Sequence, residues 1–117
     1  SDTIRHIGFV MEPHKPGWTT INNKGEKLFY AFSFDNGPDY VEEGLFRIIN
    51  DEMLMGFADT LGNVIIKPQF AFVCPFKDGK AEVTYTGEKK ALDDYGENWT
   101  WQSDDWFYID KNGNKLK

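Results

Sequence analysis

The stretch GLFRIINDEMLMGFADTLGNVIIKPQF, residues 44–70, decides the fold. Its first part alternates, with Leu45, Arg47 and Ile49 on one side of an extended chain and Phe46 and Ile48 on the other. Such alternation is typical of a β-strand, because successive side chains point to opposite faces. A polar break at residues 50–52 separates this strand from an apolar run at residues 53–58. The pattern therefore predicts an antiparallel β-hairpin.

A second reversal follows at residues 59–63. Asp59 offers a side-chain acceptor for the N–H groups of a turn, and Gly62 adopts positive φ without steric cost. The next strand is expected at residues 64–70. Pro68 has no N–H to donate to a neighbouring strand, so we expect it to mark an edge or a bend.

The same pattern recurs elsewhere in the chain. WTTINNKG (18–25) and WFYIDKNG (106–113) align with MGFADTLG (55–62). Residues 30–49 align with residues 70–84 once five residues are removed from the former. Gly44 and Gly79 are 35 residues apart, which sets the length of the repeating unit at about 35 residues. Residues expected to form the turns are Gly25, Gly44, Asp59, Gly62, Gly79, Asp110 and Gly113.

We predict one all-β domain, residues 1–117, built from antiparallel hairpin repeats, roughly two and a half in number. The units are placed at about 17–43, 44–78 and 79–117. The last unit carries an acidic insertion at about 88–105, which lacks the apolar alternation of its neighbours. We expect this insertion to be a long hairpin tip or a surface excursion.

Composition limits the classes of partner. The net charge of −6 opposes binding to the phosphate backbone of nucleic acids, and the chain has no apolar run of the roughly 18 residues needed for membrane insertion. Cys74 is the only cysteine, so an intrachain disulfide is ruled out. This cysteine usage, together with an N-terminal stretch unlike a signal peptide, favours a cytoplasmic location over the periplasm or cell surface.

The repeat resembles the WG repeat, also called the KWG repeat, of bacterial proteins. That family reads approximately F-x-E-G-L-A-x-V and then W-G-[FY]-I-D-x-x-G-x-x-[VI]-I-x-P-x-[FY]. YVEEGLFRI (40–48) is similar to the first part and MGFADTLGNVIIKPQF (55–70) to the second. The matching positions in this middle unit are Gly44, Leu45, Gly56, Asp59, Gly62, Pro68 and Phe70, with Met55 in the Trp position. The last unit keeps Trp106, Tyr108, Ile109, Asp110 and Gly113.

The resemblance covers residues 17–117 apart from the insertion. It implies a β-rich repeat array that serves as an interaction scaffold, without shared catalytic residues. Two departures concern the second residue of the W-G pair, which is Thr19 in the first unit and Phe107 in the last. We expect neighbouring backbones to approach less closely at these two positions.

Catalytic and metal-binding signals are weak, so we expect no enzyme, no cofactor and no metal. His6 and His14 lack a metal-ligand spacing, and Cys74 lies among apolar neighbours rather than in the electropositive setting of a reactive thiol. The carboxylate doublets are Glu42-Glu43, Asp93-Asp94 and Asp104-Asp105. A hydrolase using such carboxylates is the least favoured reading. A calcium site built from Asp93, Asp94, Glu97 and Asn98 is a further alternative, although these residues lack a calcium-loop spacing.

Aromatic residues give the better functional lead. Trp99 and Trp101 project from the same side of an extended chain, with Tyr95 and Trp106 close in sequence. The candidate binding residues are Tyr95, Trp99, Trp101, Trp106 and Tyr108. The competing interpretation places Trp106 and Tyr108 in the core, and it is favoured for Trp106. For Trp99 and Trp101 both interpretations stay open.

These observations favour a non-catalytic module whose partner is a protein, with the insertion as its binding surface. The alternative is a carbohydrate- or choline-binding module. WFYIDKNGNKL (106–116) also resembles the aromatic hairpin repeats of choline- and glucan-binding cell-surface modules. That family repeats about every 20 residues, whereas the period here is about 35, so the WG resemblance is preferred.

Overall fold

The computed structural model describes residues 7–34, 36–94 and 99–116. Every regular element among them is a β-strand, which confirms the all-β prediction. The strands are β1 (Ile7–Val10), β2 (Trp18–Asn22), β3 (Lys27–Ala31), β4 (Ser33–Phe34), β5 (Gly37–Pro38), β6 (Leu45–Ile49), β7 (Met55–Asp59), β8 (Val64–Phe70), β9 (Phe72–Val73), β10 (Ala81–Thr84), β11 (Glu88–Ala91), β12 (Trp99–Gln102) and β13 (Phe107–Ile109).

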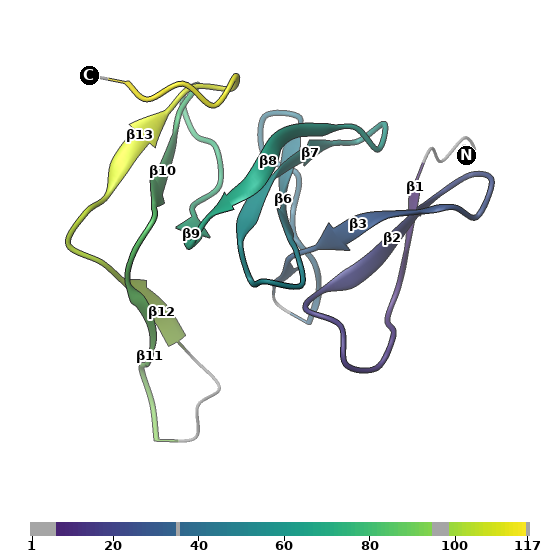
Figure 1. Cartoon of the computed structure of the whole chain (residues 1–117), viewed down its shortest axis with the longest axis horizontal. Coiled ribbons are helices and arrows are strands. Elements are labelled where there is room, and N and C mark those ends of the chain that lie inside the picture. Colours follow the sequence, from purple (N-terminus) through teal and green to yellow (C-terminus); the bar gives the residue numbers. More distant parts are fainter. Residues whose placement is uncertain (1–6, 35, 95–98, 117) are drawn as a thin grey trace.

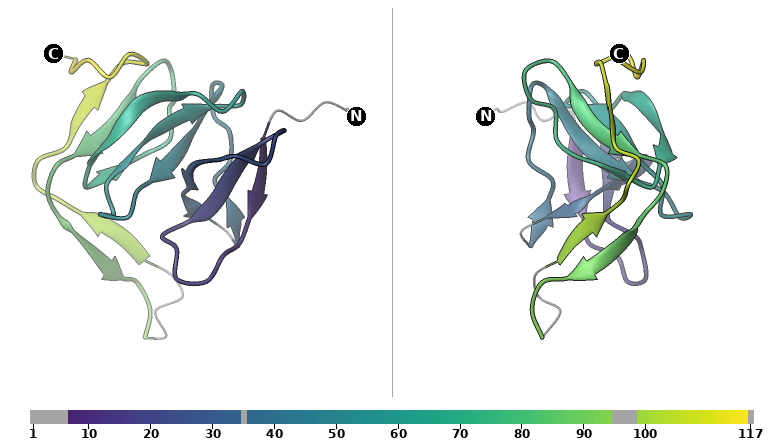
Figure 2. Two further views of the ribbon diagram at one scale, coloured as in Figure 1. Left: turned by 45° about the vertical axis from the view of Figure 1, so that its right-hand side comes forward. Right: turned by 90° about the vertical axis from the view of Figure 1, so that its left-hand side faces the viewer.

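Most strands belong to two antiparallel sheets. A six-stranded sheet has the order β1-β2-β3-β6-β7-β8, and a three-stranded sheet has the order β13-β10-β9 (Figure 1). The six-stranded sheet is strongly twisted, as the turned views in Figure 2 show. Strands β4 and β5 form one small hairpin, and β11 and β12 form another that projects from the end of β10 and β13.

Strand β6 is buried on both faces. Its odd positions, Leu45 and Ile49, join the larger hydrophobic cluster with Met55, Phe57, Ile66, Phe70 and residues of the second sheet. Its even positions, Phe46 and Ile48, join a smaller cluster with Ala31 and Ala58, against which Phe9, Trp18 and Phe29 pack. The alternating pattern thus supplies two cores, one on each side of the six-stranded sheet.

The predicted hairpin at residues 45–59 forms, and its register recurs in the last part of the chain. In the first hairpin the partners are Phe46↔Ala58, Arg47↔Phe57 and Ile48↔Gly56. In the other they are Ala81↔Ile109, Glu82↔Tyr108 and Val83↔Phe107. The residue numbers of the first strand are higher by 35 than in the first hairpin, and those of the second strand are higher by 51. The predicted insertion therefore stands between β10 and β13, where β6 and β7 are joined by a short turn.

The Asx turns share one geometry. Asp59 Oδ1 accepts hydrogen bonds from the N–H groups of Leu61 (3.0 Å) and Asn63 (2.9 Å), while Gly62 N–H donates to the Asp59 carbonyl. Asn22 and Asp110 accept the equivalent bonds at the ends of β2 and β13. Gly62 has a φ of 92°, the left-handed conformation that glycine adopts most readily.

Sequence analysis missed a fourth Asx turn between β6 and β7. Asn50 Oδ1 accepts from Glu52 N–H (3.0 Å) and Leu54 N–H (2.9 Å), and Met53 N–H donates to the Asn50 carbonyl. Met53 stands in the position of the glycine and has a φ of 65°. Because no glycine marks this turn, the predicted polar break gave its place but not its geometry.

A second type of turn links neighbouring hairpins. Residues 43–44 and 78–79 have positive φ at both positions, as two-residue type I′ turns require. Glu43 Oε1 accepts a hydrogen bond from Gly79 N–H (3.0 Å) and pairs with Lys111 Nζ (3.3 Å). These contacts lower the pKa of Glu43, chiefly through the bond from Gly79. One carboxylate thus ties together three turns from separate parts of the chain.

Gly56 allows β7 and β8 to approach closely at a bulge. The pairing passes from Met55↔Phe70 to Phe57↔Ile66, so residues 67–69, including Pro68, bulge out of β8. A Cβ atom on Gly56 would overlap the Ile66 carbonyl oxygen. Pro68 therefore lies in a bulge on the last strand of the six-stranded sheet, consistent with its lack of an N–H group.

Thr19 and Phe107, which occupy the position of Gly56 in the other two units, lie in different surroundings. Thr19 is buried and pairs regularly with Tyr30 in β3, so a Cβ at this position meets no bulge. Phe107 is partly buried and packs against the larger core. A close approach comes instead at Gly17, where a Cβ would overlap the Ala31 carbonyl oxygen.

Candidate functional site

Phe72 of β9 is the centre of an aromatic cluster. Its ring stacks on Trp101, with centroids 5.5 Å apart and an interplanar angle of 9°. Trp99, Trp106 and Phe32 meet the same ring edge to face, at centroid distances of 5.9, 6.4 and 6.0 Å. Such aromatic pairs are each worth about 0.5–1.5 kcal/mol beyond their buried area. Three segments far apart in sequence are joined at one side chain.

The hairpin of β11 and β12 positions the two tryptophans. Lys89 pairs with Trp101 and Ala91 with Trp99, so both indoles project from the same face of β12. Both reach Phe72, and Trp99 also contacts Phe32 at 6.3 Å. Trp99 and Trp101 therefore fold against the body of the molecule and remain half-buried rather than fully covered.

A polar network fixes the base of this hairpin. Trp101 Nε1–H donates to the Thr86 carbonyl at 2.9 Å. Ser103 Oγ lies 2.7 Å from Thr84 Oγ1 and 2.9 Å from Thr86 Oγ1. Gly87 has a φ of 108°, and a Cβ there would overlap the Gln102 carbonyl oxygen. The orientation of Trp101 is therefore set by the backbone and hydroxyls beneath it.

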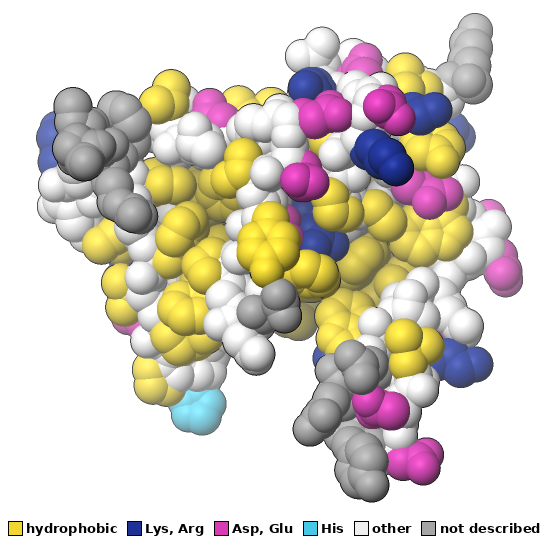
Figure 3. Space-filling view, turned by 180° about the vertical axis from the view of Figure 1, so that it is seen from behind, with side chains coloured by type: hydrophobic (Ala, Val, Ile, Leu, Met, Phe, Trp, Pro, Cys, Tyr) yellow, Lys and Arg dark blue, Asp and Glu magenta, His cyan; other side chains and the backbone are white. Residues whose placement is uncertain are grey.

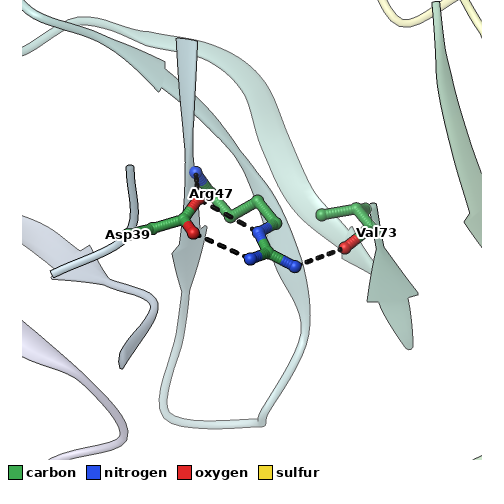
Figure 4. A network of polar contacts seen from close by, with 3 residues as sticks. All are labelled: Asp39, Arg47 and Val73. Carbon is green, nitrogen blue, oxygen red and sulfur yellow. Dashed lines mark hydrogen bonds and ion pairs between the residues drawn. The ribbon is translucent and has the colours of Figure 1, made fainter. Parts of the chain in front are cut away.

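A buried ion pair lies beside the cluster. Arg47 Nε and Nη2 donate to the two Asp39 carboxylate oxygens at 3.0 and 2.7 Å, and Nη1 donates to the Val73 carbonyl at 3.3 Å (Figure 4). The side chains of Arg47 and Asp39 are only 5% and 2% exposed. The guanidinium carbon lies 4.7, 5.3 and 5.9 Å from the ring centroids of Phe32, Phe34 and Phe72. Asp39 neutralises the guanidinium, and three rings surround it.

These residues line an open groove of about 1070 Å³ between the hairpin and the body of the protein. From behind, the surface is hollowed beside the projecting hairpin, and hydrophobic side chains gather around the opening (Figure 3). Aromatic lining residues are Phe32, Phe34, Phe72, Trp99, Trp101 and Trp106. The others are Ser33, Asn36, Arg47, Cys74 and Thr100.

A second hollow of about 790 Å³ adjoins the groove and shares Thr100, Trp101 and Trp106 with it. Its lining adds three carboxylates, from Glu88, Asp104 and Asp105. The first hollow is lined mainly by aromatic side chains and the second carries the carboxylates. We call them the aromatic groove and the acidic hollow.

The structure separates the residues predicted to bind. Trp99, Trp101 and Trp106 come together in the groove. Tyr108 is absent from both linings; it is 43% exposed and has Lys80 Nζ 4.7 Å from its ring centroid. Tyr95 lies outside the described residues. Trp106 is half-buried and meets Phe72, which packs against the larger core, but its own ring belongs to neither core cluster. The exposed Tyr108 is not a core residue.

Several groove residues were not anticipated from the sequence. Phe32, Phe34 and Phe72 look like ordinary core residues in an alternating pattern, and nothing in that pattern separates them from the rest. Arg47 carries a signal that was available. It occupies an inward position of the apolar strand 45–49, which implies a buried and therefore paired charge.

Cys74 and the acidic residues are the remaining groups with chemical potential near the site. Burial and then the Glu82 carboxylate raise the pKa of the Cys74 thiol, which disfavours the nucleophilic thiolate form. Among residues 7–34, 36–94 and 99–116, no three His, Cys, Asp or Glu side chains gather as a metal site requires. His6, and Glu97 and Asn98 of the calcium alternative, lie outside this part of the chain. Among the described residues there is no helix long and apolar enough to cross a membrane.

Comparison with known families identifies the repeat. Residues 55–88 match the family described as WG containing repeat. This stretch runs from Met55 of β7 through the bulge at Pro68 and the turn at residues 78–79 to the start of the hairpin. Searches of curated proteins and of solved structures returned no significant match to the chain. The chain therefore contains a WG repeat at residues 55–88, which confirms the resemblance for this stretch.

Proposed function

We propose that this protein is a non-catalytic binding module that takes up a segment of a partner protein in the aromatic groove. The observation that carries the proposal is the convergence of six aromatic side chains, from residues 32–34, 72 and 99–106, on one open surface. Aromatic side chains dominate the energetics of protein interfaces, because each buries a large area while losing little conformational freedom. A repeat scaffold with a specialised hairpin suits that role.

Carbohydrate is the second candidate ligand. Ser33, Asn36 and Thr100 line the groove beside the rings, and a sugar needs such hydroxyl and amide partners together with an aromatic platform. Choline is less well supported. Arg47 already lies within 6 Å of the rings of Phe32, Phe34 and Phe72, so the chain itself provides the cation for that part of the cluster.

The experiment compares ligand binding to the wild-type chain and to Trp101→Ala. Tyr108→Ala is the matched control, because it removes an aromatic ring that lies outside the groove. The chain would be screened against a random peptide library displayed on phage and against an array of neutral glycans. Peptide binding lost in Trp101→Ala and retained in Tyr108→Ala supports the proposal. Binding of glycans alone would replace it with the carbohydrate function, and no selective binding in either screen would refute both.

A further inference from the structure

Many aromatic rings of this protein have a Lys or Arg side chain of the same chain over one face. Lys89 Nζ lies 4.5 Å from the Trp99 ring centroid, Lys80 Nζ 4.7 Å from that of Tyr108, and Lys115 Nζ 5.0 Å from that of Phe107. Arg47 and Lys15 cover further rings. Within the described part of the chain, Trp101 and Trp106 have no such cation. They are the two indoles shared by the aromatic groove and the acidic hollow.

The carboxylates beside these indoles form no ion pair within the described residues, and Lys115 lines a neighbouring hollow together with Asp104, Asp105 and Trp106. Among the described residues, ion pairs join Glu12 to Lys27, Asp39 to Arg47 and Glu43 to Lys111. Glu88, Asp104 and Asp105 take part in none, and no Lys or Arg lines the acidic hollow. The hollow therefore combines two indole rings that no cation of the described residues covers with three carboxylates that form no ion pair there. That combination is complementary to an organic cation.

We propose that the acidic hollow receives a lysine or arginine side chain of the partner, while the residues next to it occupy the aromatic groove. The proposal rests on the binding function proposed above and specifies its ligand as a basic segment of a protein. The cation lies over Trp101 or Trp106 and is balanced by Asp104 and Asp105. A free small ammonium ion would fill only the hollow and leave the adjoining groove of about 1070 Å³ unoccupied.

The net charge of the protein favours the same class of partner. At −6 it repels acidic proteins and attracts basic ones, with an on-rate that falls as salt screens the charges. The aromatic groove adds no opposing charge, because Asp39 neutralises Arg47. Selectivity for a basic segment is therefore assigned to the acidic hollow and apolar affinity to the groove.

The test uses peptides enriched from a random phage-displayed library on the whole chain, after counter-selection against Trp101→Ala. The expected peptides carry Lys or Arg next to an aromatic or aliphatic residue. Their affinity should fall about tenfold in D104N/D105N, the loss expected when a partly desolvated cation loses its anionic partners. D51N/E52Q removes the same number of charges at the turn between β6 and β7, and it should change the affinity little.

Each outcome separates the two proposals. Enriched peptides that are neutral, or an equal loss in D51N/E52Q and D104N/D105N, would overturn the basic partner and leave the protein-binding function standing. No enrichment above Trp101→Ala would overturn both. Choline chloride and acetyl-arginine-amide form a second arm, followed through the indole N–H resonances of Trp101 and Trp106. If choline shifts them and no basic peptide does, the site is one for a small ammonium ligand.

Discussion

Because Gly56 has no side chain, strands β7 and β8 can approach closely at this position. A Cβ atom would overlap the carbonyl oxygen of Ile66 and crowd the peptide bond between Lys67 and Pro68. Backbone atoms of a paired strand cannot move aside as a flexible side chain can. The residue requirement thus arises from the bulge in β8. Thr19 is accommodated because it pairs with Tyr30 in the part of β3 where the register is regular.

We expect Gly56→Ala to lower the free energy of unfolding by about 1–3 kcal/mol, the usual cost of overpacking a tight contact. Gly37→Ala is the matched control. A Cβ at Gly37 meets no atom within 4 Å, and its φ is not positive, so its effect should stay within about 0.5 kcal/mol. Urea denaturation of both variants measures the difference. Equal stabilities would show that β8 shifts freely.

Arg47 is the second residue whose role depends on its surroundings. Replacing it by Leu leaves the buried Asp39 carboxylate with the backbone N–H of residue 47 but without its positive partner, which costs about 3–5 kcal/mol. Removing both charges in D39L/R47L should cost less than the sum of the two single replacements, because no uncompensated charge remains. Chemical denaturation of the four proteins forms the cycle. Additive costs would mean that the two side chains do not interact in solution.

At the scale of elements, the hairpin of β11 and β12 is both an insertion and a cover. It extends the ribbon of β10 and β13, yet its Trp99 and Trp101 contact Phe72. Gly87 and Ser103 face each other at its base, so the ribbon can be closed there. We therefore expect the hairpin to add stability while the two sheets fold without it.

Replacing residues 88–102 by an Asn-Gly turn should preserve cooperative unfolding while lowering the free energy of unfolding by about 2–4 kcal/mol. The loss comes from the ring contacts of Trp99 and Trp101 with Phe32 and Phe72, each worth about 0.5–1.5 kcal/mol. Calorimetry and the β-sheet circular dichroism spectrum provide the measurement. Loss of the cooperative transition would instead make the hairpin part of the folding core.

At the scale of the whole molecule, stability should depend on pH through the Asx turns and the Glu43 contact. Hydrogen bonds from the N–H groups of Asn114 and Asn112 lower the pKa of Asp110. At Asp59, burial opposes ionisation, but the bonds from Asn63 and Leu61 outweigh it and lower the pKa. A lowered folded-state pKa gives stability that is present above the unfolded pKa, about 3.9 for aspartate, and lost as pH falls through the folded value.

D59N/D110N should fold at neutral pH, because the amide oxygen accepts the same N–H groups, as Asn22 already does. Its free energy of unfolding should fall less steeply than that of the wild type as the pH drops below about 4. Asp51→Asn is the control for the loss of a negative charge, because it makes the same kind of change at an exposed turn position outside the Asx acceptors. A slope unchanged in D59N/D110N would show that these turns do not govern acid unfolding.

How much the sequence predicts also depends on scale. The alternation at residues 45–49 and the turn at 59–63 suffice for the hairpins, because both signals are local. The groove was beyond reach, because Phe32, Phe72 and Trp101 meet only after two sheets and a hairpin are packed together. Tyr108 shows the converse: it belongs to the same aromatic stretch as Trp106, yet it is absent from the linings of the groove and the hollow.

The turn at Asn50 has a consequence for recognising degenerate copies of this repeat in other genomes. Its hydrogen bonds equal those at Asp59 although Met53 replaces the glycine, so the Asn or Asp acceptor is the more informative letter of the motif. A search profile that weights this acceptor and relaxes the glycine should detect units that have drifted from the consensus. The replacement of the turn glycine by Met53 also offers a way to stabilise the protein. Met53→Gly would relieve the left-handed backbone strain and should raise the melting temperature.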